Sequence, residues 1–169
     1  FRGNQAHYRG AGVYLYVTQA TLDNCIFEEN QTNDWGAGIH VEIGSPLIKN
    51  CTIRNNTAST AAAIDIFASN CRVENSLIYG NSSTNSSIVI TGICSPILIN
   101  NTIVQNTSIS GSTLECEQQS GTTVTILNSI FHDNIDVTSI TNESAFEVNY
   151  SIVPADVPGA GNFALNPLF

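Results

Sequence analysis

The sequence contains no methionine and only 5 basic residues among its 169 residues. The sequence has 14 acidic residues, so the net charge is −9. A chain with so few cations cannot neutralise a run of phosphates or hold an anionic bilayer, and it has no apolar run near the roughly 18 residues of a membrane helix. We therefore expect no nucleic-acid partner and no membrane insertion of this segment. The missing methionine and leader lead us to expect a piece of a longer, processed chain.

Uncharged polar residues take the place of the missing charges. Asn, Ser and Thr number 20, 17 and 16, whereas charged residues make up only 11%. These side chains compete with helical hydrogen bonding, and glycine loses backbone entropy in a helix. The apolar residues are rich in Ile and Val, which suit strands. The composition predicts an all-β protein.

A short motif recurs through the chain and begins and ends with asparagine. The leading asparagines are separated by 26, 25, 25, 28 and 21 residues. An apolar residue lies two positions before nearly all of them and three positions after each of them, and a trailing asparagine closes most copies. The leading set is Asn24, Asn50, Asn75, Asn100, Asn128 and Asn149. This register predicts a repeat of roughly 25 residues.

A second block, about eleven residues upstream of each leading asparagine, alternates apolar and other residues. It is clearest in 13–17, 39–43, 64–68 and 89–93, and period two indicates a strand with one buried face. A coil of about 25 residues buries an apolar face only when stacked on copies of itself. We therefore predict a parallel β-solenoid of about six coils over residues 1–152, followed by a C-terminal capping segment at 153–169.

The capping segment breaks the repeat and contains three prolines, which cannot donate to a strand ladder. We expect it to fold over the last coil and to insert apolar side chains as a plug. The candidates for the plug are Phe163, Leu165, Leu168 and Phe169.

The leading asparagines have a predicted structural role. Asparagine tolerates the left-handed backbone that a tight corner needs, and amides stacked one coil apart can hydrogen-bond to one another. We predict a buried ladder at one corner, formed by Asn24, Asn50, Asn75, Asn100 and Asn128.

These motifs resemble those of a known superfamily. Phe1-Arg-Gly-Asn4, Phe27-Glu-Glu-Asn30 and Phe131-His-Asp-Asn134 look like the F-x-x-N repeats of polymorphic outer-membrane and autotransporter-type surface proteins. Gly10-Ala-Gly-Val13 and Gly36-Ala-Gly-Ile39 are similar to their G-G-A-I repeat. The resemblance implies the pectate-lyase-like right-handed β-helix. In its carbohydrate-active members the outward face of the first sheet is the substrate groove.

The alternation in the first strands assigns side chains to that outward face. We place Val13, Leu15 and Val17 inward. One outward column then reads Tyr14, His40, Asp65, Ile90 and Glu115, and the other reads Tyr16, Glu42, Phe67, Gly92 and Glu117.

Two opposed interpretations of this face remain open. Glu42 and Asp65 would lie diagonally, about 7–8 Å apart, a separation compatible with acid–base work on a glycosidic bond, and His40 would be oriented by Asp65. Tyr14, Tyr16 and Phe67 would stack on sugars, and the ligand-contacting set would include Glu115 and Glu117. The other interpretation is an ordinary solvated sheet face.

Cations that would stabilise an anionic substrate are missing from this face. We place Arg9, Lys49, Arg54 and Arg72 on turns or other faces. An acidic groove repels uronic acids unless calcium bridges them. No D-x-D-x-D run occurs, and we expect neither a metal nor a cofactor.

The five cysteines have no C-x-x-C spacing, which argues against zinc. Cys71 and Cys94 lie near one corner of successive coils and are candidates for a disulfide. Cys25 and Cys51 share a column, where either a bridge or a buried thiol stack fits, and Cys116 is predicted to be a core residue.

Two further predictions concern turns. Asn81 and Asn85 lie in a Ser/Asn/Thr-rich turn and begin N-x-S/T triplets, so they are the candidates for glycosylation. Trp35, just before Gly36, is expected to cover an edge of the core, with a surface contact as the alternative.

The sequence favours an extracellular or cell-surface β-helix module that acts as a rigid spacer, adhesin or filament unit. Its expected partners are glycans or other copies of itself. The alternative is a polysaccharide lyase or glycoside hydrolase that uses Glu42, Asp65 and His40.

Overall fold

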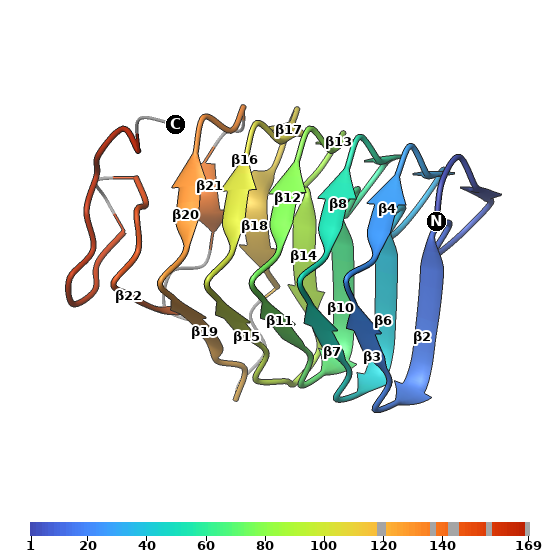
Figure 1. Ribbon diagram of the computed structural model, residues 1–169, viewed down its shortest axis with the longest axis horizontal. Coiled ribbons are helices and arrows are strands. Elements are labelled where there is room, and N and C mark those ends of the chain that lie inside the picture. The colour runs from blue at the N-terminus through green and yellow to red at the C-terminus, as the bar shows by residue number, and fades with distance from the viewer. Residues whose placement is uncertain (118–120, 136–137, 142–145, 155–156, 168–169) are drawn as a thin grey trace.

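The chain winds into a parallel β-solenoid, as a computed structural model describes it for residues 1–117, 121–135, 138–141, 146–154 and 157–167. It makes about five turns of about 25 residues, and the described residues contain no helix. Each turn of the ribbon lies beside the next, with the two ends of the chain at opposite ends of the stack (Figure 1). The predicted all-β solenoid is confirmed; the sequence-based count of six coils included partial turns at both ends.

Four parallel sheets run along the solenoid, and each turn contributes one short strand to each sheet. The first sheet contains β2 (Val13–Thr18), β6 (Ile39–Gly44), β10 (Ile64–Ser69), β14 (Ile88–Thr91), β18 (Ser112–Cys116) and β21 (Thr138–Thr141). The second contains β3 (Thr21–Asp23), β7 (Leu47–Lys49), β11 (Arg72–Glu74), β15 (Ile97–Ile99), β19 (Val124–Leu127) and β22 (Phe146–Asn149).

The two remaining sheets complete the turn. The third contains β4 (Ile26–Glu28), β8 (Thr52–Arg54), β12 (Leu77–Tyr79), β16 (Thr102–Val104) and β20 (Ile130–His132). The fourth contains β1 (Gln5–Ala6), β5 (Gln31–Thr32), β9 (Thr57–Ala58), β13 (Ser82–Ser83) and β17 (Thr107–Ser108).

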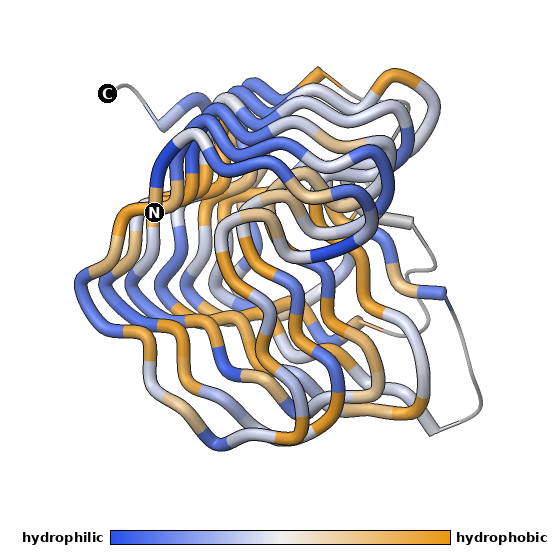
Figure 2. The backbone as a smooth tube through the Cα atoms, turned by 90° about the vertical axis from the view of Figure 1, so that its right-hand side faces the viewer, coloured by the Kyte–Doolittle hydropathy of each residue, from blue (hydrophilic) through white to orange (hydrophobic). Residues whose placement is uncertain are grey.

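Apolar side chains stack in columns through the interior. Ile53, Ile78 and Ile103 pair in register on β8, β12 and β16, and all three are fully buried. Viewed end-on, hydrophobic and hydrophilic stretches recur at the same place in successive turns (Figure 2). The repeat seen in the sequence is therefore the physical repeat of the core.

The leading asparagines occupy a corner with left-handed backbone, as predicted. From Asn24 to Asn128 their φ angles lie between 48° and 56°. The buried ladder is elsewhere, however, because the leading asparagines, Asn24, Asn50, Asn75, Asn100 and Asn128, are all exposed. In that column the side-chain bonds are Asn100 to Asn75 at 3.1 Å and Asn50 to Asp23 at 2.8 Å. A left-handed residue at this corner turns its side chain to solvent, and the residue after it turns inward.

The trailing asparagines form the buried ladder instead. From Asn4 to Asn106, each Nδ2 donates to the Oδ1 one turn on, at 2.9–3.1 Å, and each accepting Oδ1 also accepts a backbone N–H from the preceding turn. Its members are Asn4, Asn30, Asn56, Asn81, Asn106 and Asn134. Because Asn81 is 0% exposed within this ladder, its predicted place in an exposed, glycosylated turn is wrong.

The other predicted turn residue, Asn85, is exposed and donates to Thr60 Oγ1 at 2.8 Å. Its glycosylation stays a prediction.

Cys71 and Cys94 are free thiols, so the structure does not contain the predicted disulfide. Cys51, Cys71, Cys94 and Cys116 are buried and pack in the core, whereas Cys25 is half-buried. Cysteine at these positions serves as a small apolar residue.

The C-terminal segment adds a partial turn. Phe163 exchanges backbone hydrogen bonds with Ser151 and Val153, and Asn162 accepts the N–H of Ser151 at 3.1 Å. Phe163 and Leu165 are 58% and 62% exposed, so they do not form the predicted plug. Val153 and Val157 close this end of the core instead. The other two candidates, Leu168 and Phe169, lie outside the described residues.

Candidate functional site

The outward face of the first sheet gathers the predicted polar and aromatic side chains. Tyr14, His40 and Asp65 are aligned on β2, β6 and β10, and Tyr16, Glu42 and Phe67 form the neighbouring column. The next members differ from the prediction. Asp65 pairs with Val89 and Phe67 with Thr91, because this turn has 24 residues, against 25 in the turn before it and 26 in the turn after it.

The change of register at β14 moves two residues that were predicted to face outward off the outward face. Ile90 pairs with Ile66 in the buried column, and Gly92 has a φ of 79° at the corner. Val17 was placed inward, but it is 58% exposed with a φ of 46°, because the strand reaches its corner there.

His40 and Asp65 form a buried pair at the centre of this face. The His40 Nδ1 lies 2.5 Å from Asp65 Oδ2, and the two residues are 1% and 2% exposed. This contact lacks hydrogen-bond geometry, and both ring nitrogens of His40 and Oδ1 of Asp65 are buried without a hydrogen-bond partner. Such groups are uncommon in folded proteins and mark this pair as a candidate functional site.

Glu42 connects this pair to the first turn. Its Oε2 accepts from the Tyr14 hydroxyl at 2.5 Å and from Arg9 at 3.1 Å, and it lies 3.6 Å from His40 Nε2. The Tyr14 hydrogen bond is the main cause that holds the pKa of Glu42 below its ordinary value, and His40 and Arg9 act in the same direction against desolvation. The same bond raises the pKa of Tyr14. Glu42 is thus an ionised acceptor at neutral pH.

A cleft of about 210 Å³ opens beside the pair. Its lining residues are Arg9, Trp35, His40, Asp65, Phe67, Thr91 and Glu117. A neighbouring cleft of about 230 Å³ shares Trp35 and Glu117 and is also lined by Glu115. We call the two clefts together the sheet groove.

Three large side chains of this face are exposed. Tyr14, Tyr16 and Phe67 are 46%, 58% and 42% exposed, and the rings of Tyr14 and Tyr16 lie 6.2 Å apart. Large aromatic side chains that remain in water beside a cleft are a feature of binding surfaces. The structure thus brings the predicted set together, with Glu115 and Glu117 at the far end.

Sequence reasoning missed Arg9 and Trp35. Arg9 was placed away from this sheet, yet its guanidinium reaches Glu42, and Trp35 lines both clefts. Trp35 therefore contacts the surface groove, whereas the sequence favoured a cover for the core. Both residues directly precede a Gly-Ala-Gly segment, and their backbones pair one turn apart. Their equivalent position in the repeat would have predicted from the sequence that Arg9 and Trp35 lie side by side.

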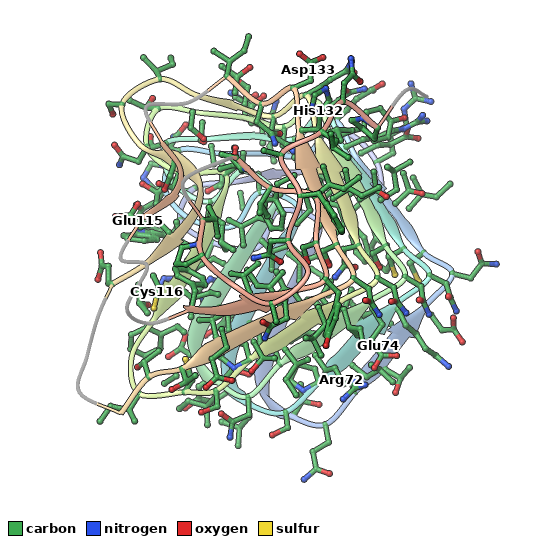
Figure 3. All side chains as sticks on the ribbon, turned by 90° about the vertical axis from the view of Figure 1, so that its left-hand side faces the viewer. Arg72, Glu74, Glu115, Cys116, His132 and Asp133 are labelled. Atoms are coloured by element: carbon green, nitrogen blue, oxygen red, sulfur yellow. The ribbon has the colours of Figure 1, made fainter. Side chains whose placement is uncertain are left out.

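Charged residues elsewhere form different groupings. Arg72 contacts Glu74 and Arg54 contacts Glu28 on other sheets. Figure 3 shows Arg72 and Glu74 on a different side of the coil from Glu115, with His132 and Asp133 apart from both. Within the described residues, no group of three or more His, Cys, Asp or Glu side chains is arranged to hold a metal ion. No helix in that part of the chain is long and apolar enough to span a bilayer.

Comparison with known proteins identifies the fold family. A family model described as "Right handed beta helix region" matches residues 1–153. Neither the curated proteins nor the solved structures give a significant match.

Proposed function

The chain belongs to the right-handed β-helix family, and we propose that it is an extracellular adhesive module that binds a glycan along the sheet groove. Its composition supports that location, since uncharged Asn, Ser and Thr supply the surface polarity in place of charged residues. The solenoid would hold the groove as a rigid display surface. The fold family alone implies no activity, so the proposal depends on the groove itself.

The observation that carries the proposal is the exposure of three aromatic side chains, Tyr14, Tyr16 and Phe67. Phe67 lines the cleft, the Tyr14 ring lies 4.9 Å from that of the cleft residue His40, and Tyr16 lies beside Tyr14. Aromatic rings offer flat apolar faces, and sugar rings present flat arrays of C–H groups that stack on such faces. The polar groups beside the rings, Glu42 and Arg9 among them, can fix the orientation of hydroxyl groups. This combination suits a carbohydrate chain lying across the strands.

The backbone makes this face stiff. β2, β6 and β10 pair in register over most of their length, and β14 continues the ladder. A surface that is ordered before binding spends little free energy on ordering itself. A shallow groove on such a surface can therefore hold an extended ligand without closing over it.

The test is a glycan array followed by calorimetric titration with each oligosaccharide that binds. Replacing both Tyr14 and Phe67 by Ala should weaken binding at least tenfold. Tyr150→Ala is the control, because Tyr150 is 65% exposed and directly follows β22, which belongs to the second sheet. Absence of any glycan ligand for the wild-type protein, or equal losses in the control, would overturn the proposal.

A second candidate function is carbohydrate cleavage, and one observation favours it. His40 contacts Asp65 at 2.5 Å while the ionised Glu42 lies 3.6 Å from the other ring nitrogen. An imidazole between two carboxylates is a plausible proton-transfer group. Wild-type protein should then release reducing ends or unsaturated products from a polysaccharide panel, and Glu42→Gln and Asp65→Asn should abolish the release. No turnover by the wild-type protein would eliminate this candidate.

A further inference from the structure

We propose that the sheet groove selects sugars that carry a protonated amine, of the glucosamine type, and that the ammonium group is held between Asp65 and Glu117. This inference rests on the proposed glycan-binding function and names its ligand class. It follows from a buried carboxylate oxygen without a hydrogen-bond partner, from the sign of the charge around it and from the aromatic walls beside it.

Asp65 is a carboxylate whose hydrogen bonding is incomplete. Its Oδ1 is buried and has no partner, and Oδ2 faces His40 Nδ1. Desolvating a carboxylate oxygen without a donor costs free energy. Because Asp65 lines the cleft, a cationic donor at the cleft floor would supply the missing compensation.

The charge around the cleft is acidic once the internal ion pair is taken into account. Arg9 lines the cleft, but its guanidinium forms an ion pair with Glu42 at 3.1 Å, and the carboxylate neutralises its charge. Glu117 faces the same cleft and is exposed. The neighbouring cleft adds Glu115, and its described lining contains no Lys, Arg or His. The sheet groove therefore attracts a cation and repels a uronic acid.

Two aromatic side chains border the acidic cleft. Trp35 and Phe67 both line it, and Phe67 is 42% exposed. An ammonium ion near an aromatic face is stabilised by the ring quadrupole, and the same faces accept the C–H groups of a sugar ring. A small inorganic cation would gain nothing from these walls, whereas an amino sugar uses both the carboxylates and the rings.

The groove can hold more than one sugar unit. The lining of the first cleft runs over successive turns from Arg9 through Asp65 to Glu117, so this cleft crosses the strands along the solenoid axis. The neighbouring cleft lies beside it and shares Trp35 and Glu117. Successive turns are about 4.8 Å apart, similar to the length of one sugar unit in an extended chain. Glu115 then lies where a second amine of the same chain would fall.

The experiment compares two oligosaccharides that differ only at nitrogen. A β-1,4-linked glucosamine tetramer and its fully N-acetylated form are titrated calorimetrically at pH 6, where the free amines are protonated. We expect the free-amine tetramer to bind at least tenfold more tightly. Asp65→Asn and Glu117→Gln should each remove most of that preference, and affinity for the acetylated tetramer should stay within about twofold.

Two controls separate the site from general attraction to an acidic protein. Glu147→Gln makes the same change of charge on β22, which belongs to the second sheet, and should leave the preference intact. Glu117 is exposed, so its variant tests the site even if the buried Asp65 variant does not fold. Equal losses in Glu117→Gln and Glu147→Gln would overturn the inference.

The remaining outcomes distinguish the two proposals. Equal binding of both tetramers overturns the amine selectivity and leaves glycan binding standing. Failure of both tetramers while a neutral or acidic glycan binds also overturns only the selectivity. If neither tetramer nor any array glycan binds, both proposals fail.

Discussion

Asn56 donates its side-chain amide to Asn81 Oδ1 at 2.9 Å, and both residues are fully buried. The same oxygen also accepts the backbone N–H of Asn56 at 3.1 Å. Asn81 in turn donates to the carbonyl of Ile53 and to the next asparagine. One amide thus satisfies the polar groups of three successive turns at a corner that water does not reach.

Asn81→Ala should therefore be severely destabilising. It leaves two donors of Asn56 without partners in the interior and removes the side-chain hydrogen bond to the Ile53 carbonyl. Unsatisfied buried groups cost about 1–3 kcal/mol each, part of which relaxation recovers, so we expect a loss of about 3 kcal/mol. Urea unfolding followed by circular dichroism measures it.

Asn75→Gly is the matched control. Asn75 is exposed and has a φ of 49°, a conformation that glycine adopts without strain. Its stability should change by less than about 1 kcal/mol. A loss as large as that of Asn81→Ala would contradict the division between exposed corner and buried ladder.

That division explains which part of the ladder could be predicted from the sequence. Two corners of each turn use the same two-residue unit, a left-handed residue followed by an inward polar or small one. Asn24-Cys25 and Glu29-Asn30 are examples, with φ of 53° and 56° at the first residue. The repeat located both asparagine columns, but spacing does not reveal which way a side chain points at a corner. Asparagine suits either half of the unit, so the exposed column was mistaken for the buried one.

The register of the outward face shows a second feature that the sequence could predict only in part. His40 beside Asp65 followed from the repeat of about 25 residues and is observed. Val89, not Ile90, continues that column because the turn is one residue shorter. Both are apolar and β-branched, so neither hydropathy nor propensity distinguishes them. The interior distinguishes them, because Ile90 stacks on Ile66.

The core column offers a second prediction. Ile78 is 0% exposed and is stacked between Ile53 and Ile103. Ile78→Ala should cost about 3 kcal/mol, because its two neighbours in the column would line a cavity, and Ile78→Val about 1 kcal/mol. Denaturant midpoints of the two variants check the graded loss. A similar loss from both would show that the site collapses rather than leaving a void.

Removing the Tyr14 hydroxyl should raise the pKa of Glu42. That hydrogen bond is the largest cause of the lowered pKa, and desolvation opposes it. In Tyr14→Phe the carboxyl should titrate at a higher pH, as followed by NMR of the side-chain carboxyl carbon. Tyr16→Phe is the control, because the Tyr16 hydroxyl is not among the groups that shift Glu42. An unchanged titration in Tyr14→Phe would contradict this, because it would mean that Arg9 and His40 alone hold the pKa of Glu42 below its ordinary value.

Stability should fall at alkaline pH because of the buried thiols. Burial raises the pKa of Cys71 from 9.0 to about 12, and the neighbouring Cys94 adds to the shift. The folded protein therefore keeps this proton while the unfolded chain releases it above pH 9. The free energy of unfolding should then fall by up to about 1.4 kcal/mol per pH unit for this thiol, between about pH 9 and pH 12.

Cys71→Ala tests this linkage through the slope of stability against pH. The variant loses a constant amount from packing at every pH, but its stability should decline less steeply than that of the wild-type protein above pH 9. Cys94 and Cys116 also have pKa values raised by burial, so the variant keeps part of the decline. Urea midpoints at pH 8, 9, 10 and 11 give the slopes. Parallel slopes would contradict the prediction, because they would mean that the Cys71 thiol ionises as readily in the folded protein as in the unfolded chain. Complete burial of Cys71 should prevent this.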